Sequence, residues 1–241
     1  MRMDIVTIFP EMCEGVFNSS ILKRAIDAGI LSVHFTNFRD FAFDKHKKVD
    51  DIPFGGGSGM VLKPEPLFLA VENIKEQSGV KNSRALLMDP CGEKFTQKKA
   101  IELSKYDNLI FICGHYEGFD ERVRSLADES LSIGDYVLTG GELPAMVIAD
   151  AVARMLPGVL GSEESPITDS FYEGILGYPT YTRPREFRDM KVPEVLFSGD
   201  HAKIREFRRK EALKRTKKLR PDLLKNAELS KEDLEFLKSV R

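Results

Sequence analysis

Short apolar runs alternate with amphipathic stretches through the first two-thirds of the chain. Four of the runs predict strands, at Asp4–Phe9, Leu31–Phe35, Arg84–Met88 and Leu109–Cys113. Five amphipathic stretches predict helices, at Ser20–Ala28, Glu65–Glu76, Gln97–Ser104, Glu121–Ala127 and Glu142–Met155. Strands joined by crossover helices are typical of a mostly parallel sheet with helices on both faces. The pattern therefore predicts an α/β fold.

The periodic pattern breaks off in the last third of the chain. Residues 158–182 are rich in Gly, Ser, Pro and Asp, which indicates a linker or a mobile segment of an active site. Farther on, Ser198 or Asp200 can cap a helix, and Ser230 followed by Asp233 can begin a last one. The C-terminal part is therefore predicted to be small, helical and separate.

The positive charge of the chain is concentrated in this C-terminal part. The segment Arg183–Arg220 holds 14 Lys and Arg against 6 Asp and Glu, whereas the whole chain has a net charge of −2. Such segregation favours a basic patch for a polyanion, although a solvated helical face fits the charge alone equally well. We predict an α/β domain over residues 1–160, a linker or mobile active-site segment over 161–182, and an all-helical basic domain over 183–241.

Glycine-containing loops follow two of the predicted strands and precede one of the predicted helices. They cover residues 89–92, 114–118 and 133–141. Ligands of parallel sheets bind beyond the carboxyl ends of the strands, so these loops are candidates for a ligand site. The segment Gly55–Gly59 could let the backbone approach a flat ligand, but an ordinary flexible surface loop is at least as compatible with it.

Several other classes of protein lack their sequence signatures here. Gly55–Gly59 lacks the Gly-Lys-Ser/Thr ending of a phosphate loop, and neither a G-x-G-x-x-G nor a G-x-S-x-G motif is present. The three cysteines form no C-x-x-C pair, which argues against disulfides and zinc and favours a reducing, cytoplasmic compartment. The apolar runs are far shorter than the roughly 18 residues of a membrane span. The residues alone thus indicate glycine-rich ligand loops and a basic tail.

Two longer stretches are much more specific than these features. Residues 114–118 read Gly-His-Tyr-Glu-Gly, and residues 132–144 read Ser-Ile-Gly-Asp-Tyr-Val-Leu-Thr-Gly-Gly-Glu-Leu-Pro. On these residues the chain resembles the bacterial tRNA (guanine-N1) methyltransferase family. The resemblance covers essentially the whole chain, with further matches at Asp44–His46, Val49–Asp51, Gly55–Met60, Pro157–Gly161, Asp169–Phe171 and Tyr181–Pro184.

The resemblance implies the SPOUT methyltransferase fold. In that fold the C-terminal part of the catalytic domain, here within residues 1–160, forms a trefoil knot, and two subunits of a homodimer share each active site. It also implies that S-adenosylmethionine is the cofactor and is bound in the knot. The positions that match the family's cofactor-binding residues are Pro90, Gly92, Gly114, Tyr116, Glu117, Ile133, Gly134, Asp135, Tyr136, Val137, Leu138, Gly140, Gly141 and Pro144.

The implied reaction methylates N1 of the guanosine just 3′ of the tRNA anticodon, at position 37. Because N1 carries a proton, a general base is needed, and by resemblance Asp169 takes this role in a segment that closes over the substrate. Negative charge then moves onto the guanine O6, and Arg154 matches the family residue that stabilises it. The same resemblance suggests Mg²⁺, held through Glu117.

The resemblance also implies how the RNA is held. The substrate-binding positions that match are Gly55, Gly56, Gly57, Gly59 and Met60, which would wall the guanine pocket, and Arg183, Arg205, Arg208 and Arg209, which would contact phosphates. The expected partner is tRNA, with neither DNA nor a membrane involved. Three alternatives stay open: a related methyltransferase for another nucleotide, a non-catalytic RNA-binding protein of this fold, and a nucleotide hydrolase that uses Gly55–Gly59.

Overall fold

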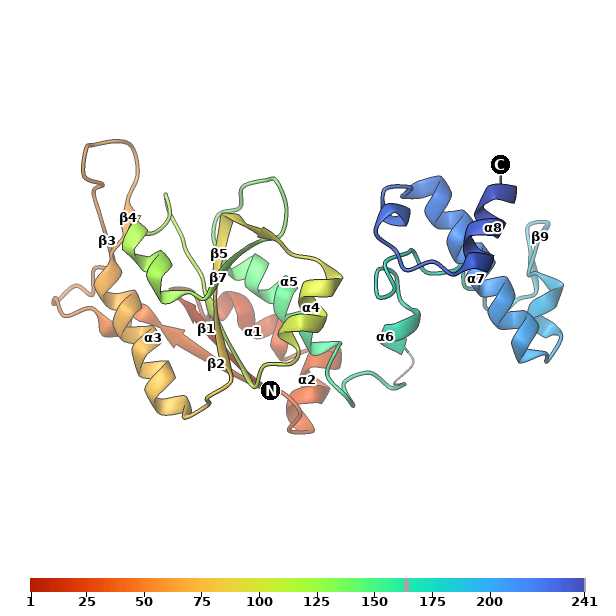
Figure 1. The fold of residues 1–241 in the computed structure, drawn as a ribbon. Helices are drawn as coiled ribbons and strands as arrows, with labels where there is room; N and C mark the ends of the chain where they lie inside the picture. Colours follow the sequence, from red (N-terminus) through yellow and green to blue (C-terminus); the bar gives the residue numbers. More distant parts are fainter. Residues whose placement is uncertain (163–164, 241) are drawn as a thin grey trace. The chain divides into compact units, whose positions relative to one another are not determined.

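The computed structural model describes residues 1–162 and 165–240 of the chain. The chain divides into two compact units, Met1–Ser162 and Glu163–Arg241 (Figure 1). The predicted linker over 161–182 begins at this division, and its residues 163 and 164 lie outside the described residues. Directly after them comes the short helix α6 (Ser165–Thr168).

The first unit contains a sheet of five strands, all parallel, in the order β2-β1-β6-β5-β7. The strands are β1 (Arg2–Thr7), β2 (Ser32–Asn37), β5 (Ser83–Lys94), β6 (Asn108–Ile112) and β7 (Glu129–Ser132). At the centre of the sheet, Ile5 of β1 lies opposite Phe111 of β6, which in turn lies opposite Leu86 of β5. The predicted parallel sheet is confirmed.

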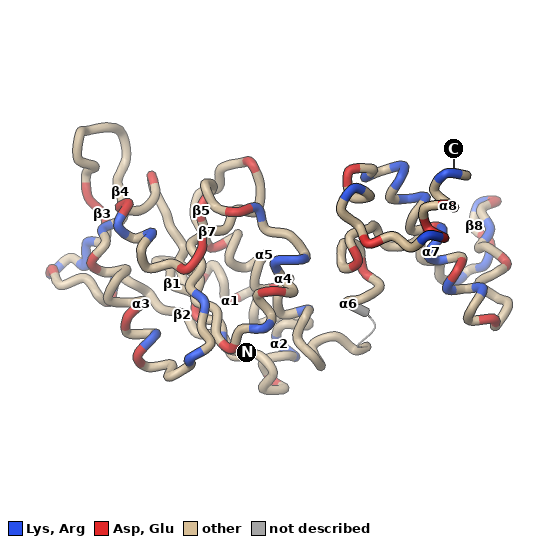
Figure 2. The backbone as a smooth tube through the Cα atoms, in the orientation of Figure 1, with Lys and Arg blue, Asp and Glu red and all other residues tan. Residues whose placement is uncertain are grey.

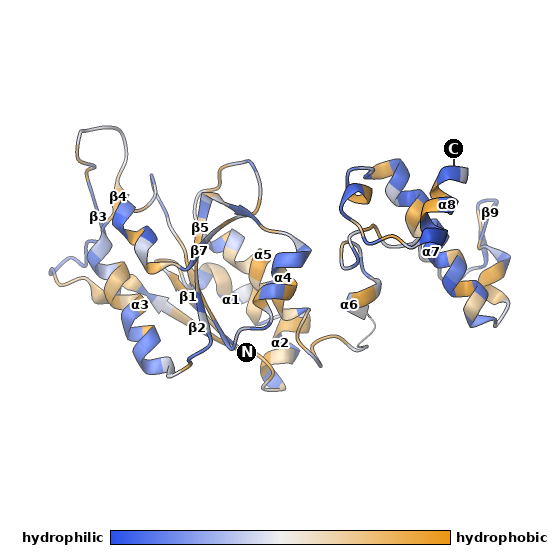
Figure 3. Ribbon diagram, in the orientation of Figure 1, coloured by the Kyte–Doolittle hydropathy of each residue, from blue (hydrophilic) through white to orange (hydrophobic). Residues whose placement is uncertain are grey.

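Helices cover both faces of this sheet, as predicted (Figure 1). One face carries α1 (Glu11–Phe17), α2 (Ser20–Asp27), α4 (Gln97–Leu103) and α5 (Glu142–Ala153). The other carries α3 (Pro64–Ser78) with the 3₁₀ helices η1 (Phe38–Phe41) and η2 (Glu121–Leu126). Figure 3 shows hydrophilic and hydrophobic residues side by side on α3, as expected of a helix with one buried face.

The two cores follow from the alternation of side chains along each strand. In β6, Leu109 and Phe111 belong to the core beneath α5, whereas Ile110 and Ile112 belong to the core beneath α3. Successive residues of a strand point to opposite faces, so an unbroken apolar run is needed where both faces are covered. The sequence of β6 therefore fixes its central, doubly buried place.

Several elements of the first unit differ from the prediction. The stretch Glu121–Ala127 is a 3₁₀ helix over Glu121–Leu126 and not an α-helix. Strand β7 and helix α1 were not predicted. A short antiparallel pair, β3 (Asp50–Asp51) and β4 (Val61–Leu62), flanks the glycine-rich segment and was also missed, because two-residue strands leave no periodic signal.

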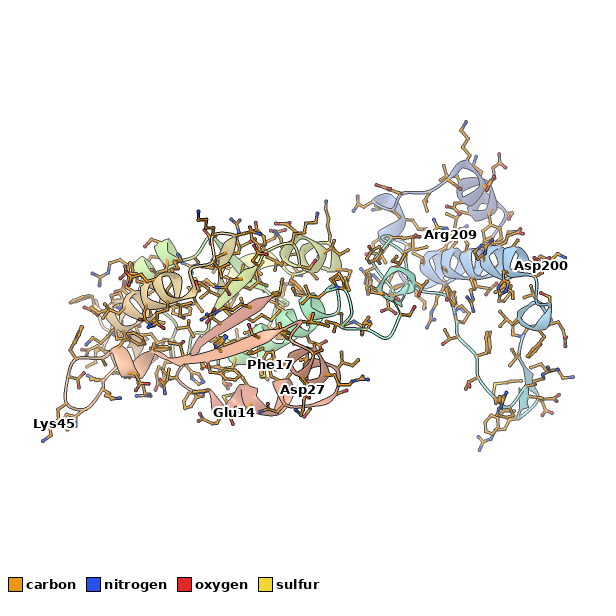
Figure 4. The ribbon with its side chains drawn as sticks, turned by 90° about the horizontal axis from the view of Figure 1, so that it is seen from below. Glu14, Phe17, Asp27, Lys45, Asp200 and Arg209 are labelled. Carbon is orange, nitrogen blue, oxygen red and sulfur yellow. The ribbon has the colours of Figure 1, made fainter. Side chains whose placement is uncertain are left out.

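The second unit is built around the long helix α7 (His201–Leu219) and α8 (Lys231–Ser239), with the 3₁₀ helices η3 (Glu194–Phe197) and η4 (Leu223–Lys225). Asp200, labelled at the start of α7 in Figure 4, caps that helix by accepting hydrogen bonds from two backbone N–H groups. The unit is not all-helical, because β8 (Glu186–Phe187) and β9 (Met190–Lys191) form a hairpin. Among the described residues, no helix has the length and apolar character needed to cross a membrane.

Candidate active site

The three predicted ligand loops meet where β6 and β7 end and where β5 bulges at residues 89–92. They enclose a cavity of about 430 Å³ within the first unit. Twelve of the fourteen predicted cofactor-binding residues line it, namely Pro90, Gly114, Tyr116, Glu117, Ile133, Gly134, Tyr136, Val137, Leu138, Gly140, Gly141 and Pro144. The other two do not: Gly92 packs against the backbone of β7, and Asp135 pairs with Lys94 at 2.9 Å.

The first wall of the cavity is a bulge in β5. Met88 and Glu93 both lie opposite Leu131 of β7, so the residues between them leave the ladder. Asp89 holds this bulge, because its carboxylate accepts a hydrogen bond from the backbone N–H of Cys91 at 2.7 Å and pairs with Arg124 at 2.6 Å. Both residues line the cavity. Asp89 lies in the predicted loop 89–92, but Arg124 and its pairing with Asp89 were not predicted, since no motif or periodicity connects the two residues.

The second wall, residues 114–118, is joined to the glycine-rich segment. The backbone N–H of Glu117 donates to the Met60 carbonyl at 3.1 Å, and that of Leu62 donates to the Gly118 carbonyl at 2.9 Å. A Cβ on Gly59 would lie 2.4 Å from the Glu117 side chain, so the loop packs directly on this carboxylate. The structure thus brings Gly59 and Met60 next to the cavity.

The third wall, residues 133–141, crosses close over the end of β6. The backbone N–H of Gly141 donates to the Gly114 carbonyl at 2.8 Å. A Cβ on Gly141 would lie 2.8 Å from the Cα of Cys113, so a residue with any side chain would separate the two segments. Farther along this wall, the ring of Tyr136 packs on the backbone of Gly134.

A buried polar cluster lies at the start of α5, behind this third wall. Glu142 is 1% exposed, and the Thr7 hydroxyl donates to its Oε1 at 2.6 Å. Burial raises the pKa of the Cys13 thiol to about 11, with Glu142 contributing, and burial also raises the pKa of Cys113 well above its ordinary value. Thiols held in the neutral form are poor nucleophiles, so these two cysteines are structural.

Four acidic residues line the cavity, and arginines neutralise three of them. Asp89 and Glu121 pair with Arg124, and Asp120 pairs with Arg122, whose guanidinium lowers the pKa of that carboxyl (Figure 2 shows the charges along the chain). Within residues 1–162 and 165–240, no cation pairs with the exposed Glu117. Glu117 therefore makes this part of the cavity favourable for a positively charged group.

The structure does not bring together a set of ligands for the expected Mg²⁺ in its described residues. Across the described residues, no group of three or more His, Cys, Asp or Glu side chains is arranged to hold a metal ion. Glu117 supplies a single carboxylate, fewer protein ligands than a dedicated site would gather. The residues present do not fit a resident metal site, and we assign no chemical step to a metal.

The two predicted catalytic residues belong to different units. Arg154 is the C-terminal cap of α5, and its backbone N–H donates to the Asp150 carbonyl at 3.1 Å. Asp169 follows α6 and lines a cavity of about 300 Å³ in the second unit. The adjacent turn is fixed, because the hydroxyl of Ser170 accepts a hydrogen bond from the N–H of Gly177 at 2.9 Å.

The predicted RNA-binding arginines have different surroundings. Arg183 and Arg208 line a groove of about 540 Å³ in the second unit, and Arg205 lies on the exposed side of α7. Arg209, labelled on α7 in Figure 4, instead pairs with Glu173 at 2.7 Å and with Asp233 at 2.8 Å. These two carboxylates neutralise the charge of Arg209, and the ion pair with Asp233 holds α8 against α7.

Comparison with known proteins identifies the family. The family model described as "tRNA (Guanine-1)-methyltransferase TrmD" matches residues 1–226. The chain is 57% identical over 240 residues to a tRNA (guanine-N(1)-)-methyltransferase of Shouchella clausii, covering 100% of this chain and 98% of that protein. A protein of the same name from Dictyoglomus turgidum is 57% identical, covering 100% of this chain and 97% of that protein. Another, from Desulforamulus reducens, is 56% identical, covering 98% of this chain and 94% of that protein. The chain therefore belongs to the tRNA (guanine-1)-methyltransferase family of enzymes.

Proposed function

We propose that this enzyme transfers the methyl group of S-adenosylmethionine to N1 of the guanosine just 3′ of the tRNA anticodon, at position 37, in the cytoplasm. The observation that carries the proposal is the cavity at the strand ends, in which twelve predicted cofactor residues converge on about 430 Å³. This volume lies within the roughly 300–1,000 Å³ of small-molecule sites.

The walls of this cavity suit an adenosyl ligand with a positive sulfonium. Glycines of the third wall expose backbone N–H and C=O groups, which can pair with the edges of an adenine without side chains in the way. Glu117 provides a negative charge that no arginine offsets among the described residues. When bound, S-adenosylmethionine supplies an electrophilic methyl group.

Asp169 acts as the general base in this proposal. N1 of neutral guanine carries a hydrogen and is a poor nucleophile, so the carboxylate of Asp169 accepts that proton as the N1–methyl bond forms. Support comes from the site around it, because the cavity beside Asp169 is also lined by Tyr178 and Arg215. An aromatic ring and a guanidinium are suitable surroundings for an RNA base and its phosphate.

Arg154 stabilises the charge that the loss of this proton creates. Negative charge moves from N1 onto O6, and a guanidinium keeps its positive charge at every accessible pH and offers a planar set of donors. The residue caps α5, the helix that begins directly after the third wall. The same helix thus connects the cofactor loop with this residue.

The knot and the homodimer are parts of the same proposal. The close crossing of Gly141 over Gly114 supports the threading of one segment past another. On α5, Leu143 and Val147 are 44% and 50% exposed, and Arg154 continues their stripe at helical spacing. Such an apolar stripe suits burial against a second copy of the chain, which would place Arg154 at the edge of a shared active site.

The test is a methylation assay with defined product mapping. The purified protein is incubated with methyl-labelled S-adenosylmethionine and an unmodified tRNA transcript carrying G at position 37, and the product is mapped by nuclease digestion and mass spectrometry. A transcript with A at position 37 is the matched control. N1-methylguanosine at position 37 is the expected product. Label at another nucleotide would contradict the assigned position, and tRNA binding without transfer would contradict catalysis.

A further inference from the structure

The second unit contains a groove whose lining includes neither Asp169 nor Arg154, although it shares Tyr178 and Thr180 with the cavity beside Asp169. It has a volume of about 540 Å³ and lies between residues 178–185, the segment Val192–Phe197 and the outer side of α7. Three arginines line it, Arg183, Arg185 and Arg208, and none of the described residues in its lining is acidic. The groove therefore favours an anion.

The groove also offers aromatic faces, and two of its arginines lie over them. The guanidinium of Arg185 is 4.1 Å from the centre of the Phe197 ring, and that of Arg208 is 4.8 Å from the centre of the Tyr178 ring. An arginine plane held against a ring presents its outer face for a second planar group to stack on. The lining thus combines positive charge with flat stacking surfaces.

The charges of these arginines are available to a ligand. In the part of the chain that the structure describes, no carboxylate pairs with Arg183, Arg185 or Arg208. Other cations of the same unit differ, since Arg209 pairs with Asp233 and Lys210 with Glu206. Phe197 remains 41% exposed although it is a large apolar side chain. Unpaired guanidinium groups beside an exposed aromatic ring are typical of a surface that binds a charged, planar ligand.

We propose that this groove binds one unpaired nucleotide of the tRNA, with its base stacked on the Arg185–Phe197 pair and its phosphate contacted by Arg183 and Arg208. The proposal rests on the tRNA methyltransferase function above and adds a second nucleotide site to it. Base-paired nucleotides do not fit this chemistry, because their faces are already stacked within a helix. The occupant must therefore come from a loop or an end of the RNA.

The first test compares two Arg–Phe pairs of the same unit. Phe197→Leu and Arg185→Gln alter the groove, whereas Phe187→Leu and Arg188→Gln alter a matched pair on the β8–β9 hairpin, where Arg188 lies 5.2 Å from the ring centre of Phe187. The affinity of the full-length protein for an unmodified tRNA transcript is measured as a function of salt. Phe197→Leu should weaken binding roughly 5- to 150-fold, the range for losing one base-stacking contact.

The salt dependence separates stacking from charge. Arg208→Gln removes a proposed phosphate contact and should lower the slope of log affinity against log salt by about 0.7–0.9, the value for one such contact, whereas Phe197→Leu should leave the slope unchanged. The hairpin variants should bind like the wild type. The proposal would be overturned if the groove variants and the hairpin variants lost tRNA affinity equally. It would also be overturned if all groove variants kept the wild-type affinity. Thermal unfolding of each variant identifies any loss that is due to misfolding.

Two further measurements identify the ligand directly. In a transcript that contains 4-thiouridine, cross-links to residues 178–208 should come from unpaired positions, and cross-links from stem positions alone would contradict the assignment. Free GMP is the second probe: if it saturates the groove while tRNA affinity is the same in all variants, the site binds free nucleotides and the RNA assignment is wrong. The wild-type methylation assay is independent, so a failure there concerns the proposed function and not the groove.

Discussion

Gly141→Ala tests whether the crossing of the third wall over β6 is needed to form the proposed cofactor cavity. The added Cβ would lie 2.8 Å from the Cα of Cys113 and 2.9 Å from the backbone nitrogen of Gly114. Ordinary van der Waals contact begins near 3.4 Å, so backbone on both sides must move apart by roughly half an ångström. Gly141 has a φ of −83°, which any residue adopts, so the effect is steric and not conformational.

The cost can be estimated from this overlap. Forcing one extra carbon into a packed site costs about 1–3 kcal/mol, which lowers the melting temperature of a domain of this size by roughly 2–12 °C. Because the displaced backbone lines the cavity, part of the same cost appears in binding, and we expect the affinity for S-adenosylmethionine to fall about tenfold or more.

Calorimetric binding of S-adenosylmethionine and thermal unfolding measure the two effects on the same protein. Gly161→Ala is the matched control, since a Cβ there meets no atom of the described residues within 4 Å. The control should bind and melt like the wild type. If Gly141→Ala also keeps the wild-type affinity and melting temperature, the close crossing does not shape the site, and the support that it gives to the knotted threading is lost.

Three other changes test different parts of the molecule. Asp169→Asn should leave S-adenosylmethionine binding intact and lower single-turnover methyl transfer about 10²- to 10⁴-fold; wild-type rates would remove Asp169 as the base. Cys91 is exposed and lines the proposed cofactor cavity, so S-adenosylhomocysteine should slow its alkylation, whereas the two buried cysteines should react only on unfolding; mass mapping of the label checks both. Arg209→Ala should destabilise the second unit by about 1–3 kcal/mol in a denaturant titration, because the buried Asp233 loses its ion-pair partner. Arg209 lowers the pKa of Asp233, so this stabilisation is present above the ordinary aspartate pKa and is lost as the pH falls through the lowered value. The acid side of the stability profile should therefore be shallower in the variant, and an unchanged profile would contradict that role.

The sequence predicts best those elements in which the pattern of apolar residues matches the faces that are buried. Strand β6 is a continuous apolar run because both of its faces are covered, and α3 is amphipathic because one face is. Strand β7 was missed for the opposite reason. It reads Glu-Ser-Leu-Ser, in which only Leu131 is apolar. Glu129 instead forms ion pairs with Arg84 and Lys99 at the edge of the sheet. An edge strand that is stabilised by ion pairs carries no hydrophobic periodicity.

The candidate site was predictable only to the level of its loops. The rule that ligands bind at the carboxyl ends of parallel strands selected residues 89–92, which are a bulge within β5, and residues 114–118, which follow β6. The family motifs supplied the individual residues. The Asp89–Arg124 pair could not be found in this way. It joins the bulge of β5 to η2, 35 positions farther along the chain, and no periodic or motif signal connects residues across that separation.

The basic segment shows why a count of charges does not identify a binding surface. Arg208 and Arg209 are neighbours in the sequence and contribute equally to the net charge of Arg183–Arg220. In the structure Arg209 is held between Glu173 and Asp233, whereas Arg208 lies over Tyr178 in a groove whose described lining residues include no Asp or Glu. Arg209 would have to break its ion pairs with two carboxylates before it could contact a phosphate. The free energy lost with these ion pairs offsets the free energy gained from the new contact. Charge reversal of Arg209 should therefore act on tRNA through the stability of the second unit, whereas reversal of Arg208 should weaken tRNA binding without unfolding it.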